Sequence, residues 1–245
     1  IGLYGLYDQN NILKLDIKKV DSFFNARKDQ NYIDDIFIDG YHTVGRKIIK
    51  RTAKEKVFFI NKQYVINFDG YIFDKHCNAQ DYVINKINDI DFSKIEYNGS
   101  YVSSILDRKS GEVTLSTDHI GSKKMFYYLN KDLAIFVYSS SFDFIVNLLK
   151  DNDINLSLSY DGVYSMVSSG FMLGDLTYAK EIKKLGQGEH LFFCPDSHSI
   201  EIQKYFKIKK NPCNNITKEQ ILEKYQFLLV QAVDRQFKIS SKIHK

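Results

Sequence analysis

The side chains that could act as nucleophiles or metal ligands are widely spaced in this sequence. Its three cysteines, Cys77, Cys194 and Cys213, are odd in number and form no CxxC pair, so neither a zinc site nor a disulfide framework is predicted. His42 and His76 lack metal-ligand spacing, which favours histidines at the surface or satisfied within the core. Because no base lies near Cys77 in the sequence, a buried and inert thiol is the simpler interpretation.

Two further polar pairs could do chemistry, and both are interpreted as turn residues. Asp118 and His119 are adjacent, but no third group completes a catalytic triad. We expect them to stabilise the turn before Gly121. Lys123 and Lys124 follow this turn and are predicted to be solvated.

The elements that must position any site begin with the stretch IGLYGLYD, which starts the chain without a charged or flexible lead-in. Chain termini usually fray, so a strand that begins at Ile1 needs a reason. Ile is not an initiator residue, which indicates that something upstream has been removed or left out. The sequence raises the question of what an ordered first residue does.

Several segments, taken together and in order, resemble one family. They are IGLYG at 1–5, NFDGYIF at 67–73, NGSYVSSILD at 98–107, STDHIGSKKMFYY at 116–128, YSMVSSGFMLGDLT at 164–177 and IKKLGQG at 182–188. They resemble the N-terminal glutaminase domain of the asparagine synthetase family, a class II glutamine amidotransferase. The resemblance covers roughly residues 1–195, and its motifs are specific in combination. It implies the Ntn-hydrolase fold, an α+β four-layer sandwich of two antiparallel β-sheets flanked by helices.

The resemblance also implies that the first residue is the catalyst. An N-terminal Cys combines a thiol nucleophile with an α-amine of pKa ~8 that acts as the general base. With Gly2 and Gly5 matched to the two glycines of the family, Ile1 falls on the nucleophile position. Ile has the amine but no nucleophile, so this position is predicted to be degenerate and no catalytic residue is assigned.

The remaining site residues are carried over from the same resemblance. Asp69 and Gly70 match the Asn-Gly pair that donates to the oxyanion, and a carboxylate there opposes a stabilisation of ~3 kcal/mol. Gly70 can still present its N–H to an anion, and it is also a good turn glycine. Arg46 matches the arginine that clamps the carboxylate of glutamine, and Gln80 the Asp that holds its amine, although a shift of one residue would place Asp81 there. The implied substrate-binding residues are therefore Arg46, Gly70 and Gln80.

Short apolar runs rich in β-branched and aromatic residues predict strands through the first two hundred residues. The expected strands are 1–7, 33–38, 57–60, 64–68, 101–107, 112–117, 125–129, 133–139 and 189–194. Tight links at 107–111 and 130–132 predict hairpins, so the middle of the chain is expected to be an antiparallel meander.

Helical patterns are fewer and suggest a boundary near residue 210. Candidate helices are 79–88, 141–150 and 159–168, and the clearest begins at Thr217, where Thr-Lys-Glu-Gln has capping-box spacing ahead of an amphipathic pattern. The polar stretch 207–216 contains Pro212 and is typical of a linker. We predict a glutaminase-like domain at 1–206, a linker at 207–216 and, at 217–245, the first helix of a synthetase (ATP pyrophosphatase) domain.

Composition excludes some partners. Lys and Arg number 34 against 30 Asp and Glu and are scattered, so a solvated surface is favoured over nucleic-acid binding. No apolar run approaches the ~20 residues of a membrane helix, and no signal peptide is expected. No membrane partner is expected, and a reducing cytoplasm is the default location.

The leading hypothesis is the degenerate, inactive glutaminase-like domain of an ATP-dependent, AMP-forming amide ligase of this family. No Gly-rich pyrophosphate loop occurs in the sequence, so no cofactor is expected on this chain. ATP and Mg²⁺ are expected for a synthetase domain on the same or a separate chain, and the resemblance makes a homodimer an expectation. The alternatives are an active glutamine-hydrolysing asparagine synthetase whose N-terminal Cys is absent from the sequence, and a stand-alone non-catalytic binding module.

Overall fold

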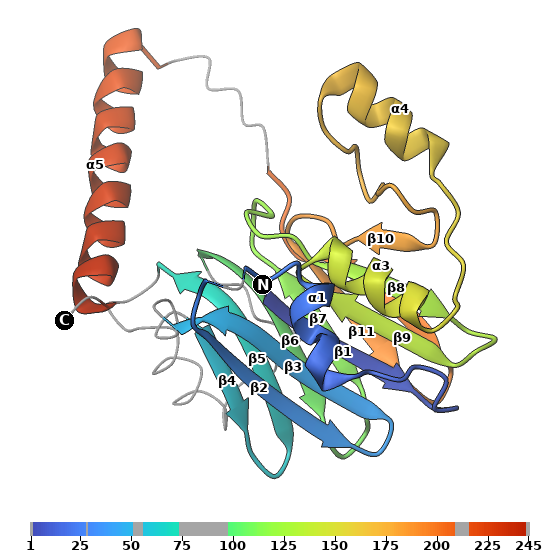
Figure 1. Ribbon diagram of the computed structural model, residues 1–245. Coiled ribbons are helices and arrows are strands. Elements are labelled where there is room, and N and C mark those ends of the chain that lie inside the picture. Colours follow the sequence, from blue (N-terminus) through green and yellow to red (C-terminus); the bar gives the residue numbers. More distant parts are fainter. Residues whose placement is uncertain (1, 28, 51–55, 74–97, 209–215, 244–245) are drawn as a thin grey trace.

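The computed structural model describes residues 2–27, 29–50, 56–73, 98–208 and 216–243, and its main body consists of two six-stranded antiparallel sheets (Figure 1). The first sheet has the strand order β10-β8-β9-β1-β3-β2. Its strands are β1 (Gly2–Asp8), β2 (Tyr32–Asp39), β3 (His42–Ile49), β8 (Phe126–Asn130), β9 (Ile135–Ser139) and β10 (Ile182–Lys184).

The second sheet has the strand order β12-β11-β7-β6-β5-β4. Its strands are β4 (Lys56–Ile60), β5 (Tyr64–Ile72), β6 (Gly99–Asp107), β7 (Val113–Thr117), β11 (Glu189–Cys194) and β12 (Ser199–Lys204). The helices of the described residues are η1 (Ile17–Lys19), α1 (Val20–Phe23), α3 (Phe142–Asp151), α4 (Tyr160–Ser169) and α5 (Lys218–Ile243).

The core lies between the two sheets, with a second apolar layer outside the first sheet. Inward-facing side chains of both sheets, such as Leu3, Val44, Val65 and Leu115, form one buried cluster. A second cluster joins the outer face of the first sheet to α1 and α3. The predicted α+β sandwich is confirmed. The expected helix 79–88 lies outside the described residues.

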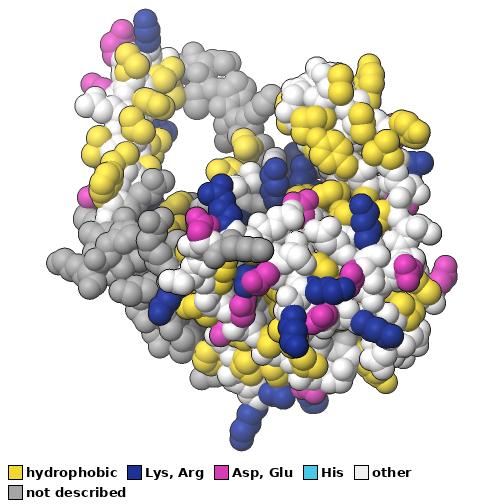
Figure 2. Space-filling view, in the orientation of Figure 1, with side chains coloured by type: hydrophobic (Ala, Val, Ile, Leu, Met, Phe, Trp, Pro, Cys, Tyr) yellow, Lys and Arg dark blue, Asp and Glu magenta, His cyan; other side chains and the backbone are white. Residues whose placement is uncertain are grey.

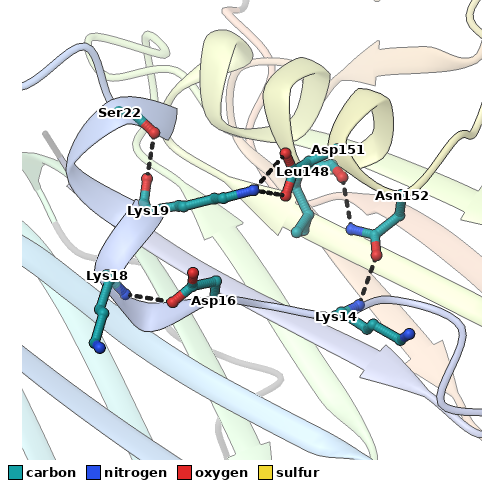
Figure 3. A network of polar contacts seen from close by, with 8 residues as sticks. All are labelled: Lys14, Asp16, Lys18, Lys19, Ser22, Leu148, Asp151 and Asn152. Carbon is teal, nitrogen blue, oxygen red and sulfur yellow. Dashed lines mark hydrogen bonds and ion pairs between the residues drawn. The ribbon is translucent and has the colours of Figure 1, made fainter.

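Polar contacts join the segment just before α1 to the end of α3 (Figure 3). The Nζ of Lys19 lies 2.9 Å from both carboxylate oxygens of Asp151. The backbone N–H of Lys14 donates to Asn152 Oδ1 at 2.7 Å, and Asn152 Nδ2 donates to the carbonyl of Leu148 at 2.9 Å. These bonds hold a short helix that has little hydrogen bonding of its own.

All nine predicted strands have a counterpart, but three strands were not predicted and one expectation was wrong. The missed strands are β3, β10 and β12. The middle of the chain is not one meander, because β6 and β7 pair in the second sheet whereas β8 and β9 pair in the first. Both hairpin links are as predicted. In the first of them, the carboxylate of Asp107 accepts from the N–H of Lys109 at 2.8 Å.

The helix that follows the predicted linker is confirmed, with its capping box. Thr217 N donates to Gln220 Oε1 at 3.1 Å, and Gln220 N donates to Thr217 Oγ1 at 3.3 Å. The large apolar side chains of α5 that the structure describes, such as Leu228, are exposed, and the helix stands apart from the sheets in Figure 1. Most of the predicted linker, 209–215, lies outside the described residues, and the domain boundary stays a prediction.

Candidate functional site

The first strand is fixed at its beginning by close packing around two glycines. β1 lies inside the first sheet, between β9 and β3. A Cβ on Gly2 would lie 1.9 Å from Ser140 Oγ, and one on Gly5 would lie 2.2 Å from the ring of Tyr138. The N–H of Leu3 donates to Ser140 Oγ at 3.0 Å. The two matched glycines are therefore required by neighbouring side chains, which hold the strand start in place.

The carboxylate of Asp69 lies between the sheets and is paired with a lysine. Asp69 is two residues beyond Asn67 on β5, and Asn67 Nδ2 donates to the carbonyl of Gly45 on β3 at 2.8 Å, so both side chains face the opposite sheet. Lys123 Nζ lies 2.6 Å from Asp69 Oδ1, with 9% of the Asp69 side chain and 32% of the Lys123 side chain exposed. A buried carboxylate thus has a cation from a loop that is distant in sequence.

This pairing corrects the prediction for the lysine pair after the Asp118 turn. Lys124 is exposed, as expected of a solvated turn, but Lys123 reaches the inter-sheet layer. The sequence offered one signal for it: a carboxylate placed in the strand interior at Asp69 requires a cation nearby.

The turn that carries Lys123 is built on Asp118, as predicted. Its carboxylate accepts from the N–H groups of Ile120 at 3.0 Å and Tyr101 at 3.1 Å, and from the hydroxyl of Ser122 at 2.5 Å. Gly121 N donates to the carbonyl of Asp118 at 3.1 Å. Asp118 is fully buried, and both of its carboxylate oxygens accept hydrogen bonds from the turn and from β6. Its role is therefore to fix the loop.

Gly70, the second residue of the Asp-Gly pair, has a backbone conformation that only glycine adopts readily. Its φ is +146°, and a Cβ would lie 2.0 Å from the carbonyl oxygen of Ser100 on the paired strand β6. Strained backbone of this kind is concentrated at functional sites. Gly70 is therefore more than an ordinary turn residue, since it lies within β5 and distorts the strand beside Asp69.

Arg46 lies in the same inter-sheet layer, on β3. Arg46 lies opposite Leu3 of the neighbouring strand β1. Its side chain is therefore on the same face of the sheet as Leu3 and Val44, which is the face toward the second sheet. Arg46 Nε donates to Asp35 Oδ2 at 2.7 Å, and the guanidinium carbon lies 5.5 Å from the ring centre of Phe58. One guanidinium face is thus committed to neighbours within the protein. Its assignment as a carboxylate clamp stays a prediction.

The side chains of Arg46 and Asp69 lie in one inter-sheet layer, and Gly70 follows Asp69 on β5. Ile1 and Gln80 lie outside the described residues, as do His76 and Cys77. Among the residues that the structure describes, no three His, Cys, Asp or Glu side chains gather as a metal site requires. The described helices include none long and apolar enough to cross a membrane.

Comparisons with known proteins bear on both fold and family. No family model matches the chain. A putative glutamine-hydrolysing asparagine synthetase of Methanocaldococcus jannaschii is 29% identical over 139 residues, which are 56% of this chain and 26% of that protein. The match therefore spans about a quarter of the length of this curated relative.

Two solved structures share the fold at 9% sequence identity. The glutamine phosphoribosylpyrophosphate amidotransferase of B. subtilis has a TM-score of 0.52, and the match covers 86% of this chain and 50% of that one. An allosteric regulatory enzyme of purine biosynthesis has a TM-score of 0.50 and corresponding shares of 83% and 49%.

The comparisons with solved structures define the fold of this domain. It is an α+β sandwich of two antiparallel sheets, and it shares this Ntn-hydrolase fold with glutamine phosphoribosylpyrophosphate amidotransferase. Its sequence is similar, over 139 residues, to that of a putative glutamine-hydrolysing asparagine synthetase.

Proposed function

We propose that this domain is the glutaminase-like part of an ATP-dependent, amide-forming ligase and that it no longer hydrolyses glutamine. The observation that carries the proposal is the Asp69 carboxylate, buried between the sheets and paired with Lys123 at 2.6 Å. In the sequence resemblance, Asp69 matches the asparagine of the family's Asn-Gly pair.

The chemical argument concerns the charge that develops during amide hydrolysis. The tetrahedral intermediate carries an oxyanion, which needs hydrogen-bond donors at the position where the charge appears. A carboxylate has no proton to donate and carries negative charge itself. Losing one such donor lowers the rate by about a hundredfold or more, and placing an anion there adds repulsion. Lys123 offsets the charge of Asp69 but is itself engaged in that pairing.

The ligase part of the proposal rests on the sequence similarity to a putative asparagine synthetase. ATP and Mg²⁺ would be held by a synthetase domain, and none of the described residues is assigned to them. In such an enzyme this domain forms a wall of the synthetase cleft or a binding surface. Its pinned first strand and fixed Asp118 turn provide a rigid scaffold for that role.

The test uses the native polypeptide, purified with its own termini, which are determined by intact mass. Ammonia released from glutamine is measured, together with the conversion of ATP to AMP and pyrophosphate with and without glutamine. We expect no ammonia above the protein-free rate and ATP turnover that does not depend on glutamine. Enzymatic ammonia release would overturn the loss of hydrolysis and support the active-glutaminase alternative. ATP turnover that requires glutamine would overturn the ligase assignment in this form.

A matched variant separates the oxyanion argument from the nucleophile. Asp69→Asn restores the donor of the resembled family without changing the size of the side chain. If the native polypeptide proves to have an N-terminal thiol, the variant is expected to raise ammonia release at least tenfold over the parent chain, by about 1.4 kcal/mol. An equal or lower rate in Asp69→Asn would show that the carboxylate is not what limits hydrolysis.

A further inference from the structure

A hollow under α4 combines an apolar wall with positive charge. We name it the α4 cleft and define it by Phe126, Phe142, Phe171, Met172, Lys124 and Lys184. Its volume is about 520 Å³, which is in the range of small-molecule sites. Figure 2 shows hydrophobic side chains gathered over α4 at the upper right, with Lys or Arg side chains below them.

The apolar wall of the α4 cleft is formed by residues that protein neighbours do not fully cover. Phe171, on the loop that follows α4, is 57% exposed, and Tyr178 near the end of that loop is also exposed. Phe126 and Phe142 contact each other edge to face at the base, with ring centres 5.7 Å apart. A concave aromatic surface of this kind is unusual unless something covers it.

The charge of the α4 cleft comes from two lysines that form no ion pair within the described part of the chain. Lys124 and Lys184 also line the adjoining polar hollow of about 490 Å³. Lys184 Nζ lies 3.5 Å from the carbonyl oxygen of Met172. Burial and the nearby charge of Lys124 lower the pKa of Lys184, and together they outweigh the opposing effect of Asp175.

The neighbouring lysines make the contrast plain. Lys123 pairs with Asp69 at 2.6 Å, Lys183 with Asp175 at 3.7 Å, and Lys204 with Glu189 at 3.8 Å. These three lysines are therefore compensated by acidic side chains. Lys124 and Lys184, which line both the α4 cleft and the adjoining polar hollow, are not part of such a pair among the described residues.

We propose that the α4 cleft binds a small amphipathic carboxylate, whose apolar body packs against the aromatic wall and whose charged group lies between Lys124 and Lys184. The charge of the ligand complements the two uncompensated lysines, and its apolar part covers Phe171 and its neighbours. The concave shape favours a small molecule over the flat surface of a partner protein. This site is separate from the amidotransferase residues and does not rest on the proposed ligase function.

The test is isothermal titration calorimetry of the full chain with three probes of equal chain length, used below their micelle concentrations. Decanoate carries the anionic head group, decanol a neutral one and decylamine a cationic one. We expect saturable binding of decanoate with a dissociation constant below about 1 mM, and binding of decanol and decylamine at least tenfold weaker. Equal binding of all three probes, or no saturable binding of decanoate, would overturn the proposal.

Variants assign the contacts. The double variant Lys124→Met with Lys184→Met keeps the aliphatic stems and is expected to weaken decanoate binding at least tenfold while leaving decanol unchanged. Lys180→Met, at an exposed lysine outside the cleft, is the control and should leave both unchanged. Phe171→Ala should weaken both probes to the same extent. If the double lysine variant binds decanoate like the parent chain, the anion does not lie between these lysines.

Discussion

Lys123 Nζ and Asp69 Oδ1 lie 2.6 Å apart, although 54 residues separate them in the sequence. The pair joins the loop before β8 to the strand β5 of the other sheet, so it ties the two sheets together at the candidate site. It also explains how a carboxylate is tolerated in the inter-sheet layer, where an uncompensated charge would be expensive.

Breaking this pair should destabilise the fold by an amount that depends on which partner is removed. Lys123→Met removes the ammonium group that lies 2.6 Å from the buried Asp69 carboxylate, and it should lower the free energy of unfolding by about 2 kcal/mol, since Lys123 is partly exposed and screened. Asp69→Asn leaves only a solvated lysine and should lower it by about 1 kcal/mol. The double variant should fall short of the sum by about 1 kcal/mol in urea unfolding.

Lys124→Met is the control for this cycle, because Lys124 is the exposed neighbour of Lys123. Its effect should stay within about 0.5 kcal/mol. Strict additivity of the two single variants would mean that the ion pair contributes no coupling.

The backbone of Gly70 supplies a second prediction. Because its φ is +146° and a Cβ would lie 2.0 Å from the carbonyl oxygen of Ser100, Gly70→Ala should destabilise the protein by more than about 3 kcal/mol. Gly40→Ala is the matched control: its φ is +55°, but no atom lies within 4 Å of the place that its methyl group would occupy. It should lower the free energy of unfolding by only about 1 kcal/mol. Equal effects of the two variants in thermal melts would show that the close approach to Ser100 relaxes easily.

Local patterns were enough to predict most strands and the turn on Asp118, but they did not reveal β3. That strand holds Gly45, Arg46 and Lys47 in its interior, which breaks the alternation that predicts a half-buried strand. Lys47 is nevertheless buried, because acidic residues from other elements pair with it. Such pairing depends on tertiary contacts, and these have no counterpart in a local pattern.

The assignment of Asp69 and Gly70 to a site stays a prediction, and the sequence did not reveal the contacts of either residue. The resemblance at 67–73 pointed to Asp69 and Gly70, and the structure places Asp69 on the face toward the other sheet, with Gly70 next to it on β5. The sequence contains many lysines, and their spacing does not show which of them pairs with Asp69. Lys123 is 54 residues away, and only the folded arrangement of the two sheets brings it close. The same holds for the pairing of Arg46 with Asp35, which requires the unpredicted strand β3.

Lys47 allows the roles of its charge and its stem to be separated. Its Nζ pairs with Asp21 and lies 2.8 Å from Asp34, while 2% of its side chain is exposed. Burial opposes the charge, but the hydrogen bonds of Asp21 and Asp34 outweigh this and raise the pKa of Lys47. Lys47→Met keeps the buried stem and frees two exposed carboxylates, so it should change the free energy of unfolding by less than about 1 kcal/mol. Lys47→Ala also removes the stem and should lower it by about 2 to 3 kcal/mol. Equal losses in urea unfolding would assign the stabilisation to the charge.

His190 should make the stability of the protein depend on pH. It is buried in β11, with Nδ1 2.8 Å from Ser116 Oγ and its ring stacked on Tyr205 at a centre distance of 4.3 Å. Burial lowers the pKa of His190 to about 4, so the folded state holds it neutral whereas the unfolded chain protonates it near 6.5. The neutral imidazole therefore contributes fully to the free energy of unfolding above about pH 6.5, and this contribution is lost progressively as the pH falls toward 4.

Between about pH 7.5 and about pH 5, this one histidine should lower the free energy of unfolding by about 1 to 2 kcal/mol. His190→Gln has no titration in this range and should flatten the pH dependence by that amount, whatever its effect on stability at neutral pH. Burial also lowers the pKa of His42 to about 4, so a residual slope should persist until His42→Gln is added. His198→Gln, at a histidine that bonds Gln9 at the surface, is the control. If His190→Gln loses stability equally at both pH values and keeps the slope of the parent chain, the buried imidazole does not cause the acid sensitivity.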